Sequence, residues 1–183
     1  MTPFEYIIGI MLLIIGLGVT QLLSKLVNRI RRRHEVKLHW IPLAWVLVVF
    51  FYQMQFLWWA FDLQSLIETW TPFTFFLLLV YALLLFLAGV LVSPRTNVEK
   101  NHHAFNSFLR EGRWALIVLA CFHSWVILFN LLMYHVKLFG PHNLMALSGM
   151  LILILTFFGR SKLSWTLGTS LFAIYIIIGR VLF

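Results

Sequence analysis

The chain alternates between long runs of apolar residues and short stretches of charged and polar residues. A helix needs about 20 apolar residues to cross a hydrocarbon core roughly 30 Å thick. Continuous apolar runs of this length argue against a transmembrane barrel, whose segments alternate and span about ten residues. The pattern predicts an all-α integral membrane bundle, a single polytopic domain over 1–183, with six transmembrane helices at about 5–27, 40–60, 72–92, 114–136, 143–159 and 163–182.

The composition strengthens this interpretation. The chain is 62% hydrophobic and 11% charged, whereas a soluble domain is about 45–50% apolar and about 25% charged. The single cysteine, Cys121, excludes an intramolecular disulfide and any multi-cysteine metal site. The net charge of +8 would suggest nucleic acid as the partner of a soluble protein. Here the basic residues flank apolar runs, so the expected partner is the lipid bilayer and not nucleic acid.

The distribution of positive charge predicts the orientation, because short cytoplasmic loops carry an excess of Lys and Arg. With the N-terminus outside, only Lys137 and Arg180 of the 14 Lys and Arg residues lie on the outer side. Glu5 precedes the first apolar run and basic residues follow it, which is the reverse of a signal peptide. We therefore expect both termini outside, in the plasma membrane or the inner membrane of a Gram-negative cell.

Tryptophans and basic residues cluster near the ends of the predicted spans. Tryptophan favours the headgroup level, and a basic cluster beside a membrane helix attracts anionic lipid headgroups, although topology alone would also explain it. A cytoplasmic partner protein could use the same basic loops. The expected headgroup anchors are Trp40, Trp58, Trp59, Trp70, Trp114 and Trp165, and the expected lipid contacts at the inner face are Lys25, Arg29, Arg31, Arg32, Arg33 and Lys37.

Several polar residues are predicted to lie at membrane depth. At 1.5 Å per residue, His123 lies near the midplane, and Asn130 shares its helical face with Ile127 and Tyr134. Tyr175 lies at a depth to meet His123. Two interpretations stay open, hydrogen bonds that hold helices together and a polar pathway for a small solute. The candidate residues are Gln53, Gln55, His123, Asn130 and Tyr175, and the two glutamines could hydrogen-bond with Asn130.

Small residues in the first span recur every four positions. Gly16, Thr20 and Ser24 form the small-xxx-small pattern that lets transmembrane helices approach closely. The pattern leaves open whether the partner helix belongs to the same chain. Together with the small size of the bundle, it favours a homo-oligomer.

The sequence lacks the common motifs of enzyme active sites. No HExxH, CxxC, Gly-x-Ser-x-Gly or glycine-rich phosphate loop occurs. His102 and His103 are adjacent and share no helical face, so a metal site would need ligands from elsewhere, such as His34 or His39. We expect no enzyme activity, no cofactor and no metal. The preferred function is a small channel or transporter-like protein for an ion or small solute; the alternative is a non-catalytic scaffold, anchor or sensor acting through its basic cytoplasmic loops.

Overall fold

The computed structural model describes residues 3–31, 39–67, 70–92 and 104–182. Within these ranges every regular element is helical, which confirms the predicted all-α class. The elements are α1 (Pro3–Arg31), α2 (Trp40–Leu66), α3 (Pro72–Val92), α4 (Ala104–Ser107), the π-helical segment η1 (Phe108–Gly112), α5 (Trp114–Met133), α6 (Pro141–Phe157) and α7 (Lys162–Leu182).

Five of these helices are long and apolar enough to cross a membrane, so the protein is a multi-pass membrane protein. Those candidate spans are Phe4–Asn28, Trp40–Phe61, Pro72–Val92, Phe108–Met133 and Lys162–Gly179. The helix at the remaining predicted span, α6, is shorter than these five and has 17 residues. It begins at Pro141, and proline is well accommodated in the first turn of a helix. The preceding helix ends earlier than predicted, because the chain turns at His135, whose φ is 50°.

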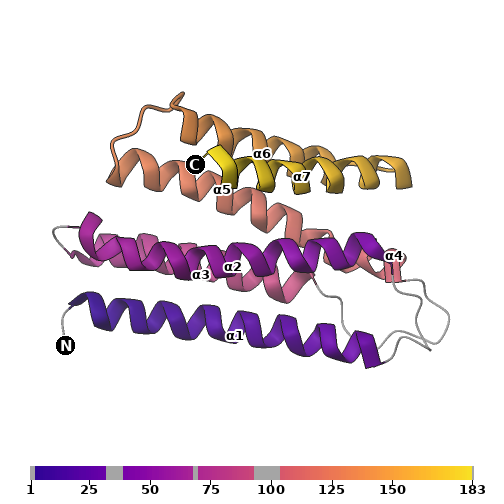
Figure 1. Cartoon of the computed structure of the whole chain (residues 1–183), viewed down its shortest axis with the longest axis horizontal. Coiled ribbons are helices and arrows are strands. Elements are labelled where there is room, and N and C mark those ends of the chain that lie inside the picture. The colour runs from indigo at the N-terminus through magenta and orange to yellow at the C-terminus, as the bar shows by residue number, and fades with distance from the viewer. Residues whose placement is uncertain (1–2, 32–38, 68–69, 93–103, 183) are drawn as a thin grey trace.

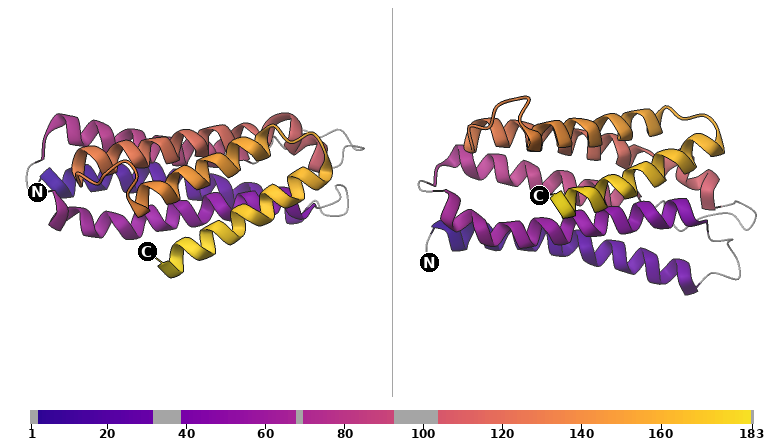
Figure 2. Two further views of the ribbon diagram at one scale, coloured as in Figure 1. Left: turned by 90° about the horizontal axis from the view of Figure 1, so that it is seen from above. Right: turned by 45° about the horizontal axis from the view of Figure 1, so that its top comes forward.

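Helices that follow one another in the chain run antiparallel, whereas the contacting pairs α1 and α3, and α2 and α7, run parallel (Figures 1 and 2). α3 packs between α1 and α5, α6 packs on α5, and α7 contacts both α6 and α2. The connections between α2 and α3 and between α5 and α6 lie at one end of the bundle, and the turn between α6 and α7 lies at the other (Figure 1). The start of α1 and the end of α7 point toward the same end of the bundle (Figure 1).

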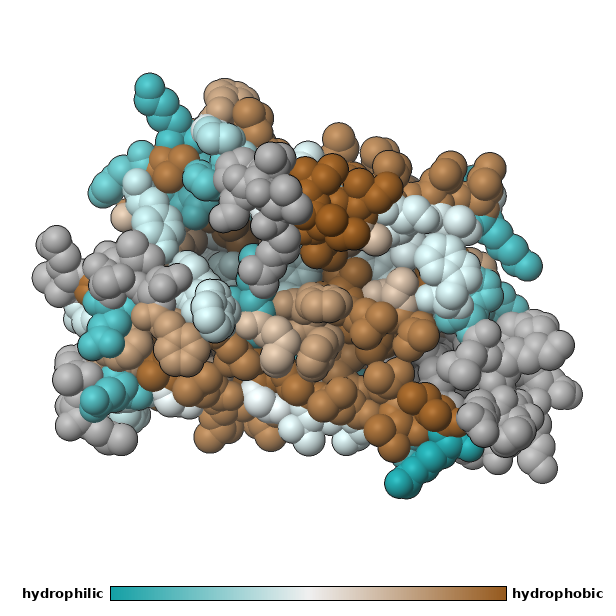
Figure 3. Space-filling model, in the orientation of Figure 1, coloured by the Kyte–Doolittle hydropathy of each residue, from teal (hydrophilic) through white to brown (hydrophobic). Residues whose placement is uncertain are grey.

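The surface of the bundle suits a lipid environment. Hydrophobic side chains cover the middle of the face shown in Figure 3, and hydrophilic ones gather toward the ends. Large apolar side chains such as Leu13 and Ile177 are more than 60% exposed. In water this exposure would be costly, whereas in a bilayer these side chains meet hydrocarbon.

The tryptophans differ in what they contact. Trp40, Trp58 and Trp114 are about half exposed or more at helix ends, as expected of headgroup anchors. Trp165 is instead buried: its Nε1 donates to the carbonyl of Gly159 at 2.9 Å and its ring meets Phe108 edge-on. The expectation that Trp165 faces the lipid was wrong, because the tight turn between α6 and α7 folds its ring into the core.

The small residues of α1 face outward. Gly16, Thr20 and Ser24 are exposed, and a Cβ built on Gly16 would meet no heavy atom within 4 Å. The glycine that packs inside the chain is Gly18, whose Cβ position lies 2.6 Å from the amide nitrogen of Gln53. The small-xxx-small face therefore serves no helix among the described parts of this chain.

Candidate functional site

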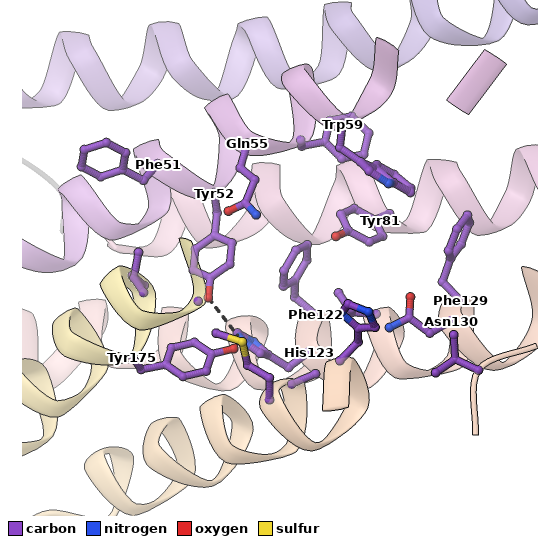
Figure 4. A pocket seen from close by; sticks show the side chains of 18 of the residues that line it. Phe51, Tyr52, Gln55, Trp59, Tyr81, Phe122, His123, Phe129, Asn130 and Tyr175 are labelled. Carbon is purple, nitrogen blue, oxygen red and sulfur yellow. Dashed lines mark hydrogen bonds between the residues drawn. The ribbon is translucent and has the colours of Figure 1, made fainter. Parts of the chain in front are cut away.

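A cavity of about 730 Å³ lies between α2, α3, α5, α6 and α7. It extends from His123 and Tyr175, in the middle of their helices, to Val136 and His142 at the connection between α5 and α6. Four of the five polar candidates predicted from the sequence line it, namely Gln55, His123, Asn130 and Tyr175 (Figure 4).

His123 is the polar centre of the cavity. Its Nδ1 lies 2.8 Å from the carbonyl oxygen of Leu119; since a carbonyl only accepts, Nδ1 carries the proton and Nε2 is the acceptor. The hydroxyls of Tyr52 and Tyr175 both lie 3.2 Å from Nε2. The two tyrosines reach the imidazole from α2 and α7 (Figure 4), so this cluster joins three helices and confirms the predicted meeting of Tyr175 with His123.

A glycine on α6 makes room for this cluster. A Cβ built on Gly149 would lie 2.6 Å from the hydroxyl oxygen of Tyr175 and 2.8 Å from Nε2 of His123. Any side chain at this position would push one of the two rings away, because real Cβ atoms do not approach other atoms so closely. Gly149 therefore sets the geometry of the hydrogen bonds although it contributes no polar side chain.

A second polar pair lies at the end of the site next to the α5–α6 connection. The Asn130 side-chain amide donates to the side-chain oxygen of Asn143 at 2.9 Å, and Asn143 donates to the carbonyl of Lys137 at 3.0 Å. Asn143 is fully buried. Asn130 thus lines the cavity and also holds the connection between α5 and α6 in place. The face of α5 that carries His123, Ile127, Asn130 and Tyr134 turns inward as predicted, since none of the four is exposed.

Gln53 does not belong to this site, contrary to the sequence-based expectation. It is fully buried, its Nε2 donates to the carbonyl of Leu85 at 3.2 Å, and it packs against Gly18 and Gly89. Residues two apart on a helix point in nearly opposite directions, so Gln53 and Gln55 cannot share a face. The expected hydrogen bond of Gln53 with Asn130 was therefore wrong.

Sequence reasoning missed the hydroxyl of Tyr52 and the ring of Trp59. The depths of polar residues along α2 single out the two glutamines, whereas the cavity is lined by Tyr52, Gln55, Phe56 and Trp59. These four positions follow the spacing i, i+3, i+4, i+7, which is one face of a helix. The same spacing could have shown that Trp59 belongs to a cavity wall and is more than a depth marker.

The basic cluster is described in part. The ammonium of Lys25 donates to the carbonyl of Val90 at 2.7 Å, at the last turn of α3, and Arg31 is exposed. Of Arg29 the structure describes only its place in α1. The other predicted lipid contacts, Arg32, Arg33 and Lys37, lie outside the described residues, as do His34, His102 and His103.

In the parts of the chain that the structure describes, no group of three or more His, Cys, Asp or Glu residues could hold a metal ion. His39 has a different role: its Nδ1 accepts a hydrogen bond from the backbone of Ile41 at 3.3 Å and caps α2. Its ring stacks on Phe105 at a centroid distance of 4.7 Å.

Comparison with protein-family models, with curated proteins and with solved structures finds no match to this chain. The geometry of the site offers a cavity with a hydrogen-bonded histidine at one end and an asparagine pair at the other, which is suited to binding a solute.

Proposed function

We propose that the protein is a small transporter-like membrane protein whose solute site is the cavity between α2, α5, α6 and α7. The observation that carries this proposal is the continuity of the lining from His123, near the middle of the bundle, to His142 at the α5–α6 connection. A cavity that reaches the middle of a membrane from one end is suited to holding a solute between the two sides.

Packing on the other side of His123 favours a transporter over an open pore. The rings of Trp45 and Phe172 are fully buried and lie 5.2 Å apart, and the Phe172 ring lies 6.1 Å from the imidazole of His123. Trp45 also donates to the hydroxyl of Thr169 at 3.1 Å. In this proposal these rings form the closed gate, and passage of a solute requires them to move apart.

The proposal includes the wider topology. The 17 residues of α6 span about 26 Å at 1.5 Å per residue, close to the thickness of a hydrocarbon core, and we include α6 as the sixth span. The N-terminus and the C-terminus are placed outside on the charge distribution, and the membrane is the plasma membrane or its Gram-negative counterpart. An impermeant thiol reagent should then label a cysteine placed at His142 in intact cells, and labelling of one placed at Arg31 would overturn the orientation.

The test of the cavity is cysteine accessibility in a Cys121→Ser background. Val126 lines the cavity, whereas Leu128, two residues along α5 and at nearly the same depth, is exposed on the outer surface of the bundle. A small charged methanethiosulfonate should label Val126→Cys at least tenfold faster than Leu128→Cys, because only the cavity offers water to the reagent. Labelling is measured in sealed vesicles with the reagent on one side at a time.

Transport predicts labelling of Val126→Cys from both sides, faster from the side that holds the α5–α6 connection. Labelling from that side alone would overturn transport and leave a binding protein. Equal, slow labelling of both variants would mean a dry core and favour the alternative function, a scaffold, anchor or sensor acting through its basic loops.

A further inference from the structure

The lining of the cavity carries almost no charge. Among the described residues, the nineteen that line it include no Asp, Glu, Lys or Arg. A charged solute held near the middle of a bilayer needs a partner of opposite charge, because the desolvation of an unpaired ion is very costly. The cavity is therefore built for an uncharged molecule.

Aromatic residues make up about half of the wall. Nine of the nineteen lining residues are Phe, Tyr or Trp. The rings of Trp59 and Tyr81 are stacked at 5.3 Å and 24°, and Phe122 meets Tyr81 edge-on at 4.7 Å. Offset stacked and edge-to-face arrangements are the preferred contacts between aromatic rings. A flat ring can extend this pattern, whereas a flexible chain gains nothing from it.

The hydrogen bonds at His123 engage one hydroxyl proton and leave the second one able to change partner. Nε2 has a single lone pair in the plane of the ring, and two hydroxyls, of Tyr52 and Tyr175, lie 3.2 Å from it. Only one of them can donate to Nε2 with good geometry at a time, and the two hydroxyls also interact with each other. The hydroxyl that does not donate to Nε2 can exchange its bond to the neighbouring tyrosine for one to an oxygen of a bound molecule, and the bond to the imidazole stays intact.

We propose that the cavity binds a planar, uncharged aromatic carbonyl compound, of the quinone or aryl ketone type. Its ring would lie along the wall formed by Trp59, Tyr81 and Phe122, and a carbonyl oxygen would accept from Tyr52 or Tyr175. The cavity volume of about 730 Å³ falls within the range of small-molecule sites. This inference rests on the proposed function, because it names the solute class of the same cavity.

The experiment compares two probes with the same ring system, 1,4-naphthoquinone and naphthalene. All proteins in it also carry Cys121→Ser, because a quinone adds covalently to an exposed free thiol. The full chain in lipid nanodiscs is dialysed to equilibrium against each probe, and uptake by empty nanodiscs is subtracted. The wild type should bind the quinone about threefold to tenfold more tightly than the hydrocarbon, the usual net effect of one neutral hydrogen bond.

Single variants assign the hydrogen bond. Tyr52→Phe and Tyr175→Phe each keep a ring in the wall and one hydroxyl for Nε2, so the bundle stays folded and the naphthalene affinity stays unchanged. In at least one of them the preference for the quinone should disappear. Tyr6→Phe, exposed on α1, is the matched control and should keep it.

Equal affinity of the wild type for both probes would overturn the inference, and so would variants that lose both probes to the same extent. The failure of the transport proposal is separate. If the protein prefers the quinone but Val126→Cys is not labelled, the transport proposal fails and the ligand class stands. If Val126→Cys is labelled but the quinone is not preferred, the ligand class fails and the transport proposal stands.

Discussion

Gln53 and His123 are both buried polar residues in apolar helices, yet their surroundings differ. Gln53 sits where α1, α2 and α3 meet, and the Cβ positions of Gly18 and Gly89 lie 2.6 and 2.9 Å from its amide nitrogen. His123 sits where α2, α5, α6 and α7 meet, and aromatic rings around it leave a cavity. A glycine lies close to each polar group, since the Cβ position of Gly149 is 2.8 Å from Nε2 of His123. The difference is that large aromatic rings around His123 hold the helices apart. The neighbouring side chains therefore decide whether a buried polar group is tightly packed or lines a cavity.

The largest expected effect tests the close packing around Gln53. Gly18→Leu should lower the free energy of unfolding by about 2–3 kcal/mol, because the added side chain must displace a fully buried amide that is bonded to Leu85. Unfolding is followed by adding sodium dodecyl sulfate to protein in mild detergent.

Gly16→Leu is the matched control, since nothing lies within 4 Å of its Cβ position. It should change the unfolding free energy by less than about 0.5 kcal/mol. If the protein is a homo-oligomer that pairs through Gly16, Thr20 and Ser24, as we propose, the same variant should weaken assembly in light scattering. A monomeric wild type over a range of concentrations would remove that proposal. Equal destabilisation by the two leucines would contradict the packing described for Gln53.

A smaller effect is expected at the mouth of the cavity. Asn143→Ala removes the two hydrogen bonds that join Asn130 to the carbonyl of Lys137. At about 0.5–1.5 kcal/mol for each bond, the loss should be about 1–3 kcal/mol, with faster proteolysis of the connection at 134–140. Ser148→Ala, on the exposed side of α6, is the control. Unchanged proteolysis would mean that Asn143 does not hold the connection.

The next prediction compares the two polar residues directly. His123→Leu leaves two tyrosine hydroxyls without their shared acceptor and should cost about 1 kcal/mol, since hydrogen bonds between membrane helices average about 0.6 kcal/mol. Gln53→Met should be within about 0.5 kcal/mol of the wild type, because the Gln53 side-chain oxygen has no partner among the described residues and its removal offsets the one lost bond. A larger cost at Gln53 than at His123 would reverse the comparison.

The sequence predicts the helices well because they follow from hydrophobicity and length. It also predicts the inward face of α5, since His123, Asn130 and Tyr134 mark one side of an otherwise apolar helix. It fails on α2, where Gln53 and Gln55 lie two residues apart and on nearly opposite sides of the helix, so nearly equal depth alone does not show which of them faces the cavity. Gly149 could not be recognised at all, because its importance depends on side chains that come from α5 and α7.

The smallest expected effect concerns a second histidine, His39, which lies just before the α2 span. Burial, and secondly the nearby Lys162 ammonium, lower the pKa of His39 below its usual value. The neutral imidazole is the form that accepts the cap bond from Ile41. The unfolded chain therefore binds the proton more readily than the folded one, so stability is full above about pH 6.5 and falls as the pH drops below it.

His39→Asn separates the cap from the titration. Asparagine is a good N-cap and does not titrate, so this variant should keep the stability of the wild type at pH 7.5 and lose less of it at pH 5. His39→Ala should cost about 0.5–1 kcal/mol at pH 7.5 through loss of the cap, and it too should lose less on acidification. The unfolding free energies of the three proteins at the two pH values test this. Equal decreases of the unfolding free energy in all three proteins would assign the acid sensitivity to other groups. A smaller decrease in both variants would show that His39, unlike Gln53 or His123, contributes to stability through its protonation state.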